Sequence, residues 1–456
     1  TKKYFQLMYL ILFLGIVMRI GYMLYTGAYV RSHDAGKLGL DQYGHFSYIH
    51  RIYMTGKLPN TNRGQLYHQP LFHILSVMMM KVVRLFTKDY EISRLIEAAK
   101  IISCFASCAT LRITYLICKE LDLEYKFSCI VTAFIAFLPN MYLLSGRINN
   151  DSLVIYFIFV IILYTIRWSK TRSYKNTIIL ALAFGLGIST KISCGIFAVF
   201  TGTIMLIVLI KEIHDGHVFS ILKKLVCFGV ISFPLGLWFP IRNHTLFKQP
   251  FNYVLRIPLE SDLFCGDKGI VKRFIHIPIN TMFDNLYNRP KEDYNIHIYT
   301  IKGALFGEFS FDIADIIPIA LLIIYFVILF IAIIGMVYAI IQGIKSIIDK
   351  TIKDKSIHDI FMYFGAPSIW GIMMVSYIVF NIKYPFGCTM DYRYIVPTAL
   401  VNAIMFGYCY HIVESEITKT SNLLYMRLGR VFIAFVKILI ILFSILSLVM
   451  FCNINK

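Results

Sequence analysis

Long apolar runs alternate with short polar segments along most of the chain. The first run, residues 4–25, is long enough to cross a bilayer, which takes about 20 residues. Lys2 and Lys3 precede this run and no small-residue cleavage site follows it, so we expect a retained first helix. Further apolar runs lie at about 98–118, 127–146, 152–167, 177–189, 191–210, 222–241, 313–344, 359–382, 394–413 and 431–453. This pattern predicts an all-α polytopic membrane protein with about eleven spans.

The segment 70–86 is apolar but ambiguous, because it is short and carries a histidine, a lysine and an arginine. Such a segment fits an amphipathic helix that lies on the membrane surface. If it does not span, the basic short loops fall on the same side as the N-terminal lysines, as the positive-inside rule requires. Those loops are 119–126, 168–176, 211–221, 345–358 and 414–430. We therefore expect two long extracytoplasmic segments, 27–97 and 242–312.

The composition agrees with a membrane protein. The 456 residues are 58% hydrophobic and 16% charged, whereas soluble domains average about 45–50% and about 25%. A net charge of +19 would suggest nucleic acid in a soluble protein, but basic loops that orient membrane helices give it another cause. The ten cysteines include no CxxC pair and no zinc-type spacing. Only Cys265 and Cys388 lie in polar segments, and they could pair if both face an oxidising compartment.

A first candidate cluster, LDQYGHFSYI, lies in the first long outer segment. Its Asp41 and His45 are four residues apart, a spacing that on a helix places both side chains on one face. A carboxylate beside an imidazole can act as a base with its orienting group, or it can bind a metal. The alternative is that Asp41 only caps the helix that follows.

Two more clusters follow along the chain. His68 could contact a phosphate or a sugar, or it could lie in a solvated turn, and Pro70 would begin the surface helix. Arg147, Asn150 and Asp151 lie at the outer junction of two spans. Charge so near the membrane is costly unless it is paired or functional. We favour a functional role here over an arginine–aspartate pair that caps a short turn.

A last group contains cations and a tyrosine. Arg393 could clamp a phosphate with two parallel hydrogen bonds, and Tyr394 could lie at the lipid interface. Lys383 belongs to the same group. The alternative is that the group forms a positive anchor in an aromatic belt. Lys191, between two short spans, could contact a phosphate or extend its ammonium group outward.

Other classes of protein lack support. The sequence contains no G-x-x-x-x-G-K-[ST] loop, no H-E-x-x-H helix and no G-x-S-x-G turn. Proline and glycine do not interrupt two matching spans as in an inverted-repeat transporter. A substrate path through the spans would also need many charges deep within them, and there are few, chiefly Arg19, Arg112 and Lys437.

In their order along the chain, these clusters resemble the GT-C superfamily of polytopic glycosyltransferases. The pattern is most similar to family 39-like enzymes, the protein O-mannosyltransferases and the lipid A aminoarabinose transferase. The resemblance covers most of residues 1–210, and its motifs are LDQYGHFSYI with GKLP, YHQPLFHIL, SGRINNDSLVIYF, STK and a late DYRYIVP. Gln42 follows Asp41 where many relatives have a second acidic residue, and His68-Gln69-Pro70 stands where relatives often have His-Pro-Pro.

The resemblance implies a GT-C-like helical bundle with amphipathic surface helices in the first outer loop. It divides the chain into a transmembrane catalytic module over 1–241, an extracytoplasmic loop or cap over 242–312, and C-terminal transmembrane helices over 313–456. It implies that Asp41 is the catalytic base, assisted by Asp151 and His45. The implied donor-phosphate ligands are Lys191, Lys383 and Arg393, and the implied substrate contacts are His68, Arg147, Asn150 and Tyr394.

By the same resemblance, the donor is a polyprenyl-phosphate sugar, and the acceptor is a glycan, a lipid or a protein. The reaction takes place on the extracytoplasmic face of a bacterial plasma membrane or the lumenal face of a eukaryotic endoplasmic reticulum. A divalent metal stays open as a cofactor, and nucleic acid is not an expected partner. The alternatives to an enzyme are a non-enzymatic lipid or polysaccharide transporter and an assembly subunit.

Overall fold

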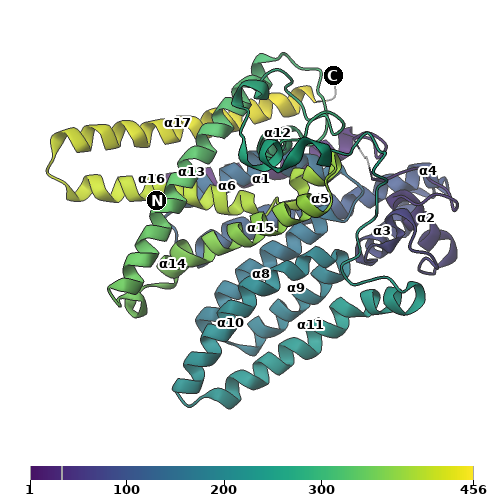
Figure 1. Cartoon of the computed structure of the whole chain (residues 1–456), viewed down its shortest axis with the longest axis horizontal. Coiled ribbons are helices and arrows are strands. Elements are labelled where there is room, and N and C mark those ends of the chain that lie inside the picture. The colour runs from purple at the N-terminus through teal and green to yellow at the C-terminus, as the bar shows by residue number, and fades with distance from the viewer. Residues whose placement is uncertain (1, 32–33, 455–456) are drawn as a thin grey trace. The chain divides into compact units, whose positions relative to one another are not determined.

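In this computed structural model, the described residues are 2–31 and 34–454, and they form helices joined by turns and loops, without a β-strand (Figure 1). The predicted modules 1–241 and 313–456 also include residues 1, 32–33 and 455–456, which lie outside the described residues. The chain groups into two compact units. One consists of Thr1–Met18, Thr114–Tyr142 and Pro258–Lys456, and the other of Arg19–Ile113 and Leu143–Ile257. The predicted three-part division stays a prediction.

Two long helices contribute residues to both units, α1 (Lys2–Tyr25) and α5 (Lys100–Glu120). The other elements of the Arg19–Ile257 unit, which we call the outer-loop unit, are α2 (His45–Thr55), η1 (Gly64–Tyr67), α3 (Leu71–Thr87), α4 (Ile92–Leu95), η2 (Ile96–Ala99), η3 (Leu144–Gly146), α8 (Asp151–Thr171), α9 (Tyr174–Thr190), η4 (Ile192–Ile196), α10 (Phe197–His214) and α11 (Val218–Phe247).

The other unit, which we call the C-terminal unit, contains most of the remaining chain. Its elements are α6 (Tyr125–Phe137), α7 (Pro139–Leu143), η5 (Gly266–Lys268), η6 (Val271–Ile275), η7 (Ile279–Met282), α12 (Ile296–Phe306), α13 (Ile316–Ile348), η8 (Ile352–Asp354), α14 (Ile357–Ile360), η9 (Phe361–Gly365), α15 (Ala366–Lys383), η10 (Gly387–Met390), η11 (Tyr392–Tyr394), α16 (Thr398–Lys419) and α17 (Leu423–Asn453). Here α13 packs on α16 and α17, and α6 packs on the same two helices.

The apolar runs predict the long helices well. Among the described residues, eight helices are long and apolar enough to cross a membrane, or nine if the bent pair Tyr125–Phe137 and Pro139–Gly146 is one span. These findings confirm a multi-pass membrane protein. Even when the bent pair is counted as a span, two of the eleven predicted spans are not among the candidates. Helix α9 has only 17 residues, which reach about 25 Å at 1.5 Å per residue, and α16 contains the polar Asn402 and His411. The count of eleven therefore stays a prediction.

Helices α8, α9, α10 and α11 lie side by side in the outer-loop unit (Figure 1). The Trp168 side chain on α8 is fully buried, and its indole N–H donates to Thr177 Oγ1 on α9 at 2.9 Å. Between α9 and α11 the backbones approach closely, because a side chain on Gly185 would meet Leu235 Cβ at 2.6 Å. These contacts fix α9 between α8 and α11, and so they fix where α9 ends.

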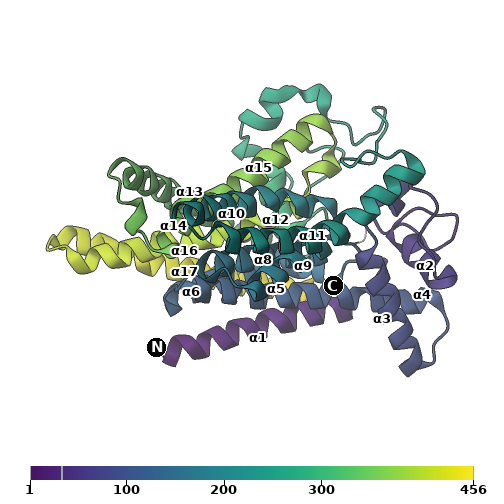
Figure 2. The same cartoon turned by 90° about the horizontal axis from the view of Figure 1, so that it is seen from below.

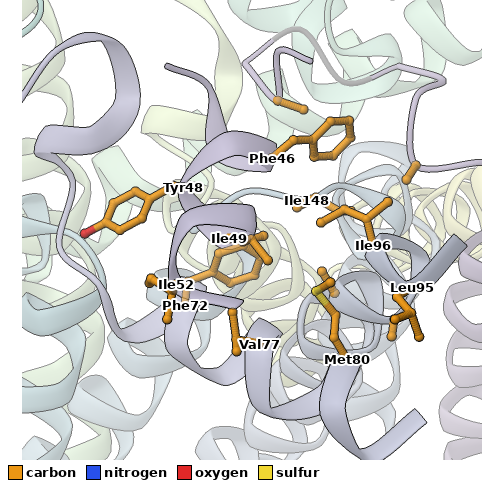
Figure 3. Packing of buried hydrophobic residues seen from close by; sticks show 14 of the residues in the cluster. Phe46, Tyr48, Ile49, Ile52, Phe72, Val77, Met80, Leu95, Ile96 and Ile148 are labelled. Atoms are coloured by element: carbon orange, nitrogen blue, oxygen red, sulfur yellow. The ribbon is translucent and has the colours of Figure 1, made fainter. Parts of the chain in front are cut away.

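An apolar cluster holds together the first long outer segment, residues 27–97, which we call the outer segment. Helix α2 packs on α3, and their inner faces meet η2 through side chains such as Phe46, Ile49, Phe72 and Ile96, all fully buried (Figure 3). An amphipathic helix in this way buries one apolar face and leaves its polar face outside. The predicted surface segment 70–86 corresponds to one helix, α3 (Leu71–Thr87), which is not among the candidate spans.

The turn that follows α1 is fixed by one lysine. The Lys100 ammonium donates to the carbonyl oxygens of Met23 at 2.8 Å and Thr26 at 2.5 Å, and it pairs with Glu97 at 2.5 Å. A cation at the C-terminal end of a helix satisfies carbonyl groups that have no partner within the helix. Glu97 also accepts a hydrogen bond from the Ala28 backbone N–H at 2.8 Å. The outer segment therefore leaves α1 along a defined path.

Replacing Gly335 with alanine should destabilise the C-terminal unit by about 1–3 kcal/mol, the usual cost of overpacking. The reason is that a Cβ on Gly335 of α13 would lie 2.4 Å from the Met405 carbonyl oxygen of α16. The measurement is thermal unfolding of the purified protein in detergent. The matched control is Gly371→Ala, because among the described residues no atom beyond its chain neighbours and its own helix backbone lies within 4 Å of a Cβ there. Equal melting temperatures for both variants would contradict the close helix crossing.

Candidate active site

The end of α9 and the start of α8 meet at a buried ion pair. The Lys191 ammonium lies 2.5 Å from Asp151 Oδ1, and the side chains are only 14% and 3% exposed. Asp151 is the first residue of α8 and Lys191 follows the last residue of α9. A helix favours an anion at its N-terminus and a cation at its C-terminus, so each charge lies where its own helix stabilises it.

Two asparagines complete this junction. Asn149 Nδ2 donates to Asp151 Oδ2 at 3.0 Å, and Asn149 Oδ1 accepts from the Asp151 backbone N–H at 3.2 Å. Asn150, at the N-cap of α8, donates from Nδ2 to the Thr190 carbonyl at 3.0 Å. Asp151 therefore receives hydrogen bonds on both carboxylate oxygens, as a buried charge requires.

Arg147 is placed differently from what its spacing suggests. The four-residue spacing to Asp151 would make a helical pair, but Arg147 lies in extended backbone before the N-cap Asn150. The Arg147 side chain is buried, and its carbonyl oxygen accepts from Ser103 Oγ at 2.6 Å. Asp151 pairs with a lysine 40 residues away in the sequence, and residues 147–151 form no continuous helical turn.

The outer segment contacts the junction through Gln69. Its side chain is 5% exposed, and Oε1 accepts from the Ile192 backbone N–H at 3.2 Å. Two contacts hold the preceding residues. Tyr48 Oη donates to the His68 carbonyl at 3.1 Å, and Asn243 Nδ2 on α11 donates to the Tyr67 carbonyl at 3.3 Å. Residues 67–69 are therefore fixed beside the end of α9.

Three histidines form one cluster next to this junction. His45 Nδ1 and His73 Nε2 are 2.9 Å apart, so one ring donates a proton to the other. The His68 ring stacks on His45 with centroids 5.6 Å apart, and Tyr48 stacks on His73 at 3.9 Å. His45 and Tyr48 lie on α2 and His73 lies on α3, two elements of the apolar cluster, while His68 directly follows η1.

The electrostatic environment keeps two of these rings neutral near pH 7. Burial is the largest cause that lowers the pKa of His68 well below its ordinary value, and His45, Lys191 and His73 add to it, while Asp151 opposes it. Burial and His45 likewise lower the pKa of His73 well below the ordinary value. Since neutral imidazole has one donor and one acceptor nitrogen, each of these rings can donate one hydrogen bond and accept another.

Asp41 lies outside helix α2, because that helix begins at His45 with Gly44 as its N-cap. A side chain on Gly44 would lie 2.2 Å from the Ala35 carbonyl oxygen, and the Phe46 N–H donates to that oxygen at 2.9 Å. Both sequence interpretations, the shared helical face with His45 and the helix cap, are therefore wrong. The Asp41 carboxylate is exposed, and Gln42 Nε2 donates to it at 3.4 Å.

The C-terminal unit carries the remaining predicted site residues. Arg393 Nε lies 3.2 Å from Asp391 Oδ2, with side chains 8% and 1% exposed. Arg393 also lies over the Tyr394 ring, 5.2 Å from its centroid. Lys383 ends α15 and is exposed, with its ammonium 5.6 Å from the Tyr384 ring centroid. Lys191 belongs to the outer-loop unit, so the predicted donor-phosphate group divides between the two units.

Four residues with a clear structural part were absent from the predicted site: Gln69, His73, Asn149 and Asp391. Asp391 had a signal in the sequence, because an aspartate two residues before an arginine can pair with it locally. His73 had a weaker signal, as a titratable residue on the apolar side of a surface helix. Asn149 had a local signal as well, because it lies two residues before its partner Asp151. Gln69 had none, because its partner Ile192 is 123 residues away in the sequence.

The described residues contain no preformed set of metal ligands. None of them form a group of three or more histidine, cysteine, aspartate or glutamate side chains that could hold one. His45 and His73 use their facing nitrogens in a hydrogen bond to each other. Cys265 and Cys388 are not joined by a disulfide in this structure.

Replacing Lys191 with methionine should destabilise the protein by about 3–5 kcal/mol, because it leaves the buried Asp151 charge without its partner. Unfolding in detergent, followed by tryptophan fluorescence, measures this. The double variant Asp151→Asn with Lys191→Met should recover part of the loss. The matched control is Lys291→Met, whose ion pair with Asp262 is exposed at 66% and 73% and should change little. Equal effects of the two lysine variants would refute the buried pair.

The protein should lose stability on acidification from about pH 7.5 to about pH 5. A histidine whose folded pKa is lowered binds fewer protons in the folded state, so its contribution is full above its ordinary pKa and is lost as the pH falls. The slope reaches up to about 1.4 kcal/mol per pH unit for each such ring. Melting temperatures across this range should depend less on pH in His73→Gln, whereas the exposed His276→Gln keeps the parent profile. Parallel profiles in all three proteins would speak against the cluster.

No protein-family model matches this chain, and no curated protein matches it. Three solved structures of the Archaeoglobus fulgidus oligosaccharyltransferase are similar to it. The apo form has a TM-score of 0.51 at 12% identity, over 99% of this chain and 56% of that chain. A form tethered to an acceptor peptide containing the NVT sequon has a TM-score of 0.49 at 11% identity, over 98% and 55%. The complex with zinc and sulfate has a TM-score of 0.45 at 12% identity, over 97% of this chain and 52% of that chain.

The chain thus spans about half the length of these structures. At this identity the likeness concerns the fold alone. The fold of this chain, built from multiple apolar helices, is therefore similar to that of the Archaeoglobus fulgidus oligosaccharyltransferase.

Proposed function

We propose that the chain is a membrane glycosyltransferase that moves a sugar from a polyprenyl-phosphate donor to an acceptor on the extracytoplasmic or lumenal face. The observation that carries the proposal is the buried Asp151–Lys191 pair with His68 and Gln69 beside it. Buried charges at the end of candidate spans are costly and are usually retained for function. The glycosyltransferase-like fold supports the same reading at the level of fold.

The reaction breaks the bond between the sugar's anomeric carbon and the donor phosphate oxygen, and the polyprenyl phosphate leaves with the electron pair. A new bond forms between that carbon and an acceptor hydroxyl or amine. The acceptor proton goes to a base, for which we propose the Asp41 carboxylate. Its exposure suits a group that must reach an incoming acceptor. Asp151 and His45 assist by orienting groups around the reacting centre.

The developing phosphate charge needs cations nearby, since preorganised positive groups stabilise charge that grows in the transition state. We propose Lys191, Lys383 and Arg393 for this role. Lys191 has three N–H donors and gives one to Asp151, so that pair does not by itself exhaust its donors. Arg393 keeps a planar guanidinium next to Asp391 and Tyr394. His68, Arg147, Asn150 and Tyr394 would contact the substrates.

A lipid-linked donor explains why the sequence needs no nucleotide-binding motif. The polyprenyl tail lies among the spans, and the sugar reaches the polar groups at their ends. The acceptor is a glycan, a lipid or a protein. In this orientation the short basic loops lie on the cytoplasmic side, and the segments 27–97 and 242–312 lie opposite them.

Replacing Asp41 with asparagine should lower the rate of sugar transfer by about 100-fold or more, the usual contribution of a general base. The assay follows labelled sugar from a polyprenyl-phosphate donor into a membrane extract that serves as the acceptor pool. Asp151→Asn should also lose activity. The matched control is Asp89→Asn, a change of the same type in the same outer segment, where Asp89 pairs with Arg94 at 3.3 Å. Parent-like transfer by a folded Asp41→Asn protein would remove that residue from the proposed mechanism.

A further inference from the structure

A short segment in the long outer stretch 242–312 exposes an unusual number of large apolar side chains. It covers residues 270–279, around the helical turn η6. Five aliphatic residues there are exposed by 47–68%, namely Ile270, Val271, Ile275, Ile277 and Ile279. In a polar loop such side chains are normally buried or absent, and a contiguous exposed group marks an interaction surface.

The backbone of this segment is held from the protein side. Arg273 is the buried member, and its Nη2 donates to the Asn381 carbonyl of α15 at 3.0 Å. Asn295 Nδ2 donates to the carbonyls of Lys272 at 2.8 Å and His276 at 2.7 Å. Polar side chains therefore anchor the inner side of the segment while its aliphatic side chains point outward. The exposure is a fixed feature of the fold.

The anchor point identifies what covers these side chains. Asn381 lies two residues before the end of the candidate span Ile357–Lys383, and in Figure 2 the loop containing the segment lies beside that end of α15. The same helix exposes Val375, Val379 and Ile382 by 63%, 57% and 49%. This spacing forms one stripe along a helix. The exposed aliphatic side chains of 270–279 thus continue the surface that α15 presents to lipid.

The polar residues here are those of a membrane interface. Lys272 on the segment and Lys383 at the end of α15 are both exposed, and Tyr384 follows directly. Lysine extends its ammonium group toward headgroups while its stem stays in apolar surroundings, and tyrosine is enriched at the interface. Basic residues beside exposed aliphatic ones characterise segments that lie in the interface plane and favour anionic lipids.

We propose that residues 270–279 are a membrane-interface anchor, in which the five aliphatic side chains insert into the leaflet at the α15 end of the bilayer. The ligand is the bilayer itself, with acyl chains against the isoleucines and valine and anionic headgroups against Lys272. The anchor holds the 242–312 stretch down on the membrane surface. It is independent of the proposed sugar transfer and holds for a transporter or an assembly subunit equally.

The test places a tryptophan at the proposed depth. Ile275→Trp, and separately Val271→Trp, are made in the full chain, which has three native tryptophans as a constant background. Each protein is reconstituted into vesicles of phosphatidylcholine and phosphatidylglycerol, with or without brominated acyl chains. Bromine quenches only tryptophans that lie among acyl chains, whereas aqueous iodide quenches only those in water. The parent protein gives the background for subtraction.

The emission added by either new tryptophan should fall in brominated vesicles and should resist iodide. Glu260→Trp, an exposed position in the same outer stretch, shows that iodide reaches this face of the protein. Because Val271→Trp probes the same surface, one poorly folding variant does not end the test. Quenching of both new tryptophans by iodide, without quenching by bromine, would overturn the proposal and indicate a surface that faces water or another protein.

Discussion

The outer-loop unit depends on one buried ion pair, between Asp151 at the start of α8 and Lys191 at the end of α9. Two charges taken out of water cost more than their attraction returns unless each also receives hydrogen bonds. Here Asn149 serves the carboxylate, and Asn150 ties the two helix ends together. Because Lys191 stops α9 in extended backbone, Ile192 presents its N–H to Gln69, and the outer segment docks at that point.

The same arrangement sets the chemistry around the pair. An apolar cluster built from α2, α3 and η2 surrounds the three histidines on one side. Burial in this cluster and the charge of Lys191 both disfavour an imidazolium at His68. A polar site with neutral rings, one carboxylate and one ammonium group thus lies in a frame of aliphatic and aromatic side chains. Such surroundings strengthen any electrostatic contact with a bound phosphate.

The long helices could be predicted because a span needs a continuous apolar run, which is visible in any single sequence. The start of α3 after Pro70 was equally readable, since proline suits the first turn. The Asp41–His45 interpretation is wrong because the tight approach of Gly44 to Ala35 delays the helix until His45. Contacts such as His45 with His73, or Asp151 with Lys191, join residues 28 and 40 positions apart. Such pairs follow from packing and leave no local pattern.

The central claim is that a sugar is transferred and its lipid carrier is released. The most direct measurement uses a polyprenyl-phosphate sugar carrying one radioactive label in the sugar and another in the phosphate, supplied to proteoliposomes of the unaltered chain with a membrane extract as acceptor. The account predicts that the labels separate, with the sugar label in the acceptor pool and the phosphate label in polyprenyl phosphate. If both labels stay together on the donor, or cross the bilayer together, the chain is no transferase and the account is contradicted.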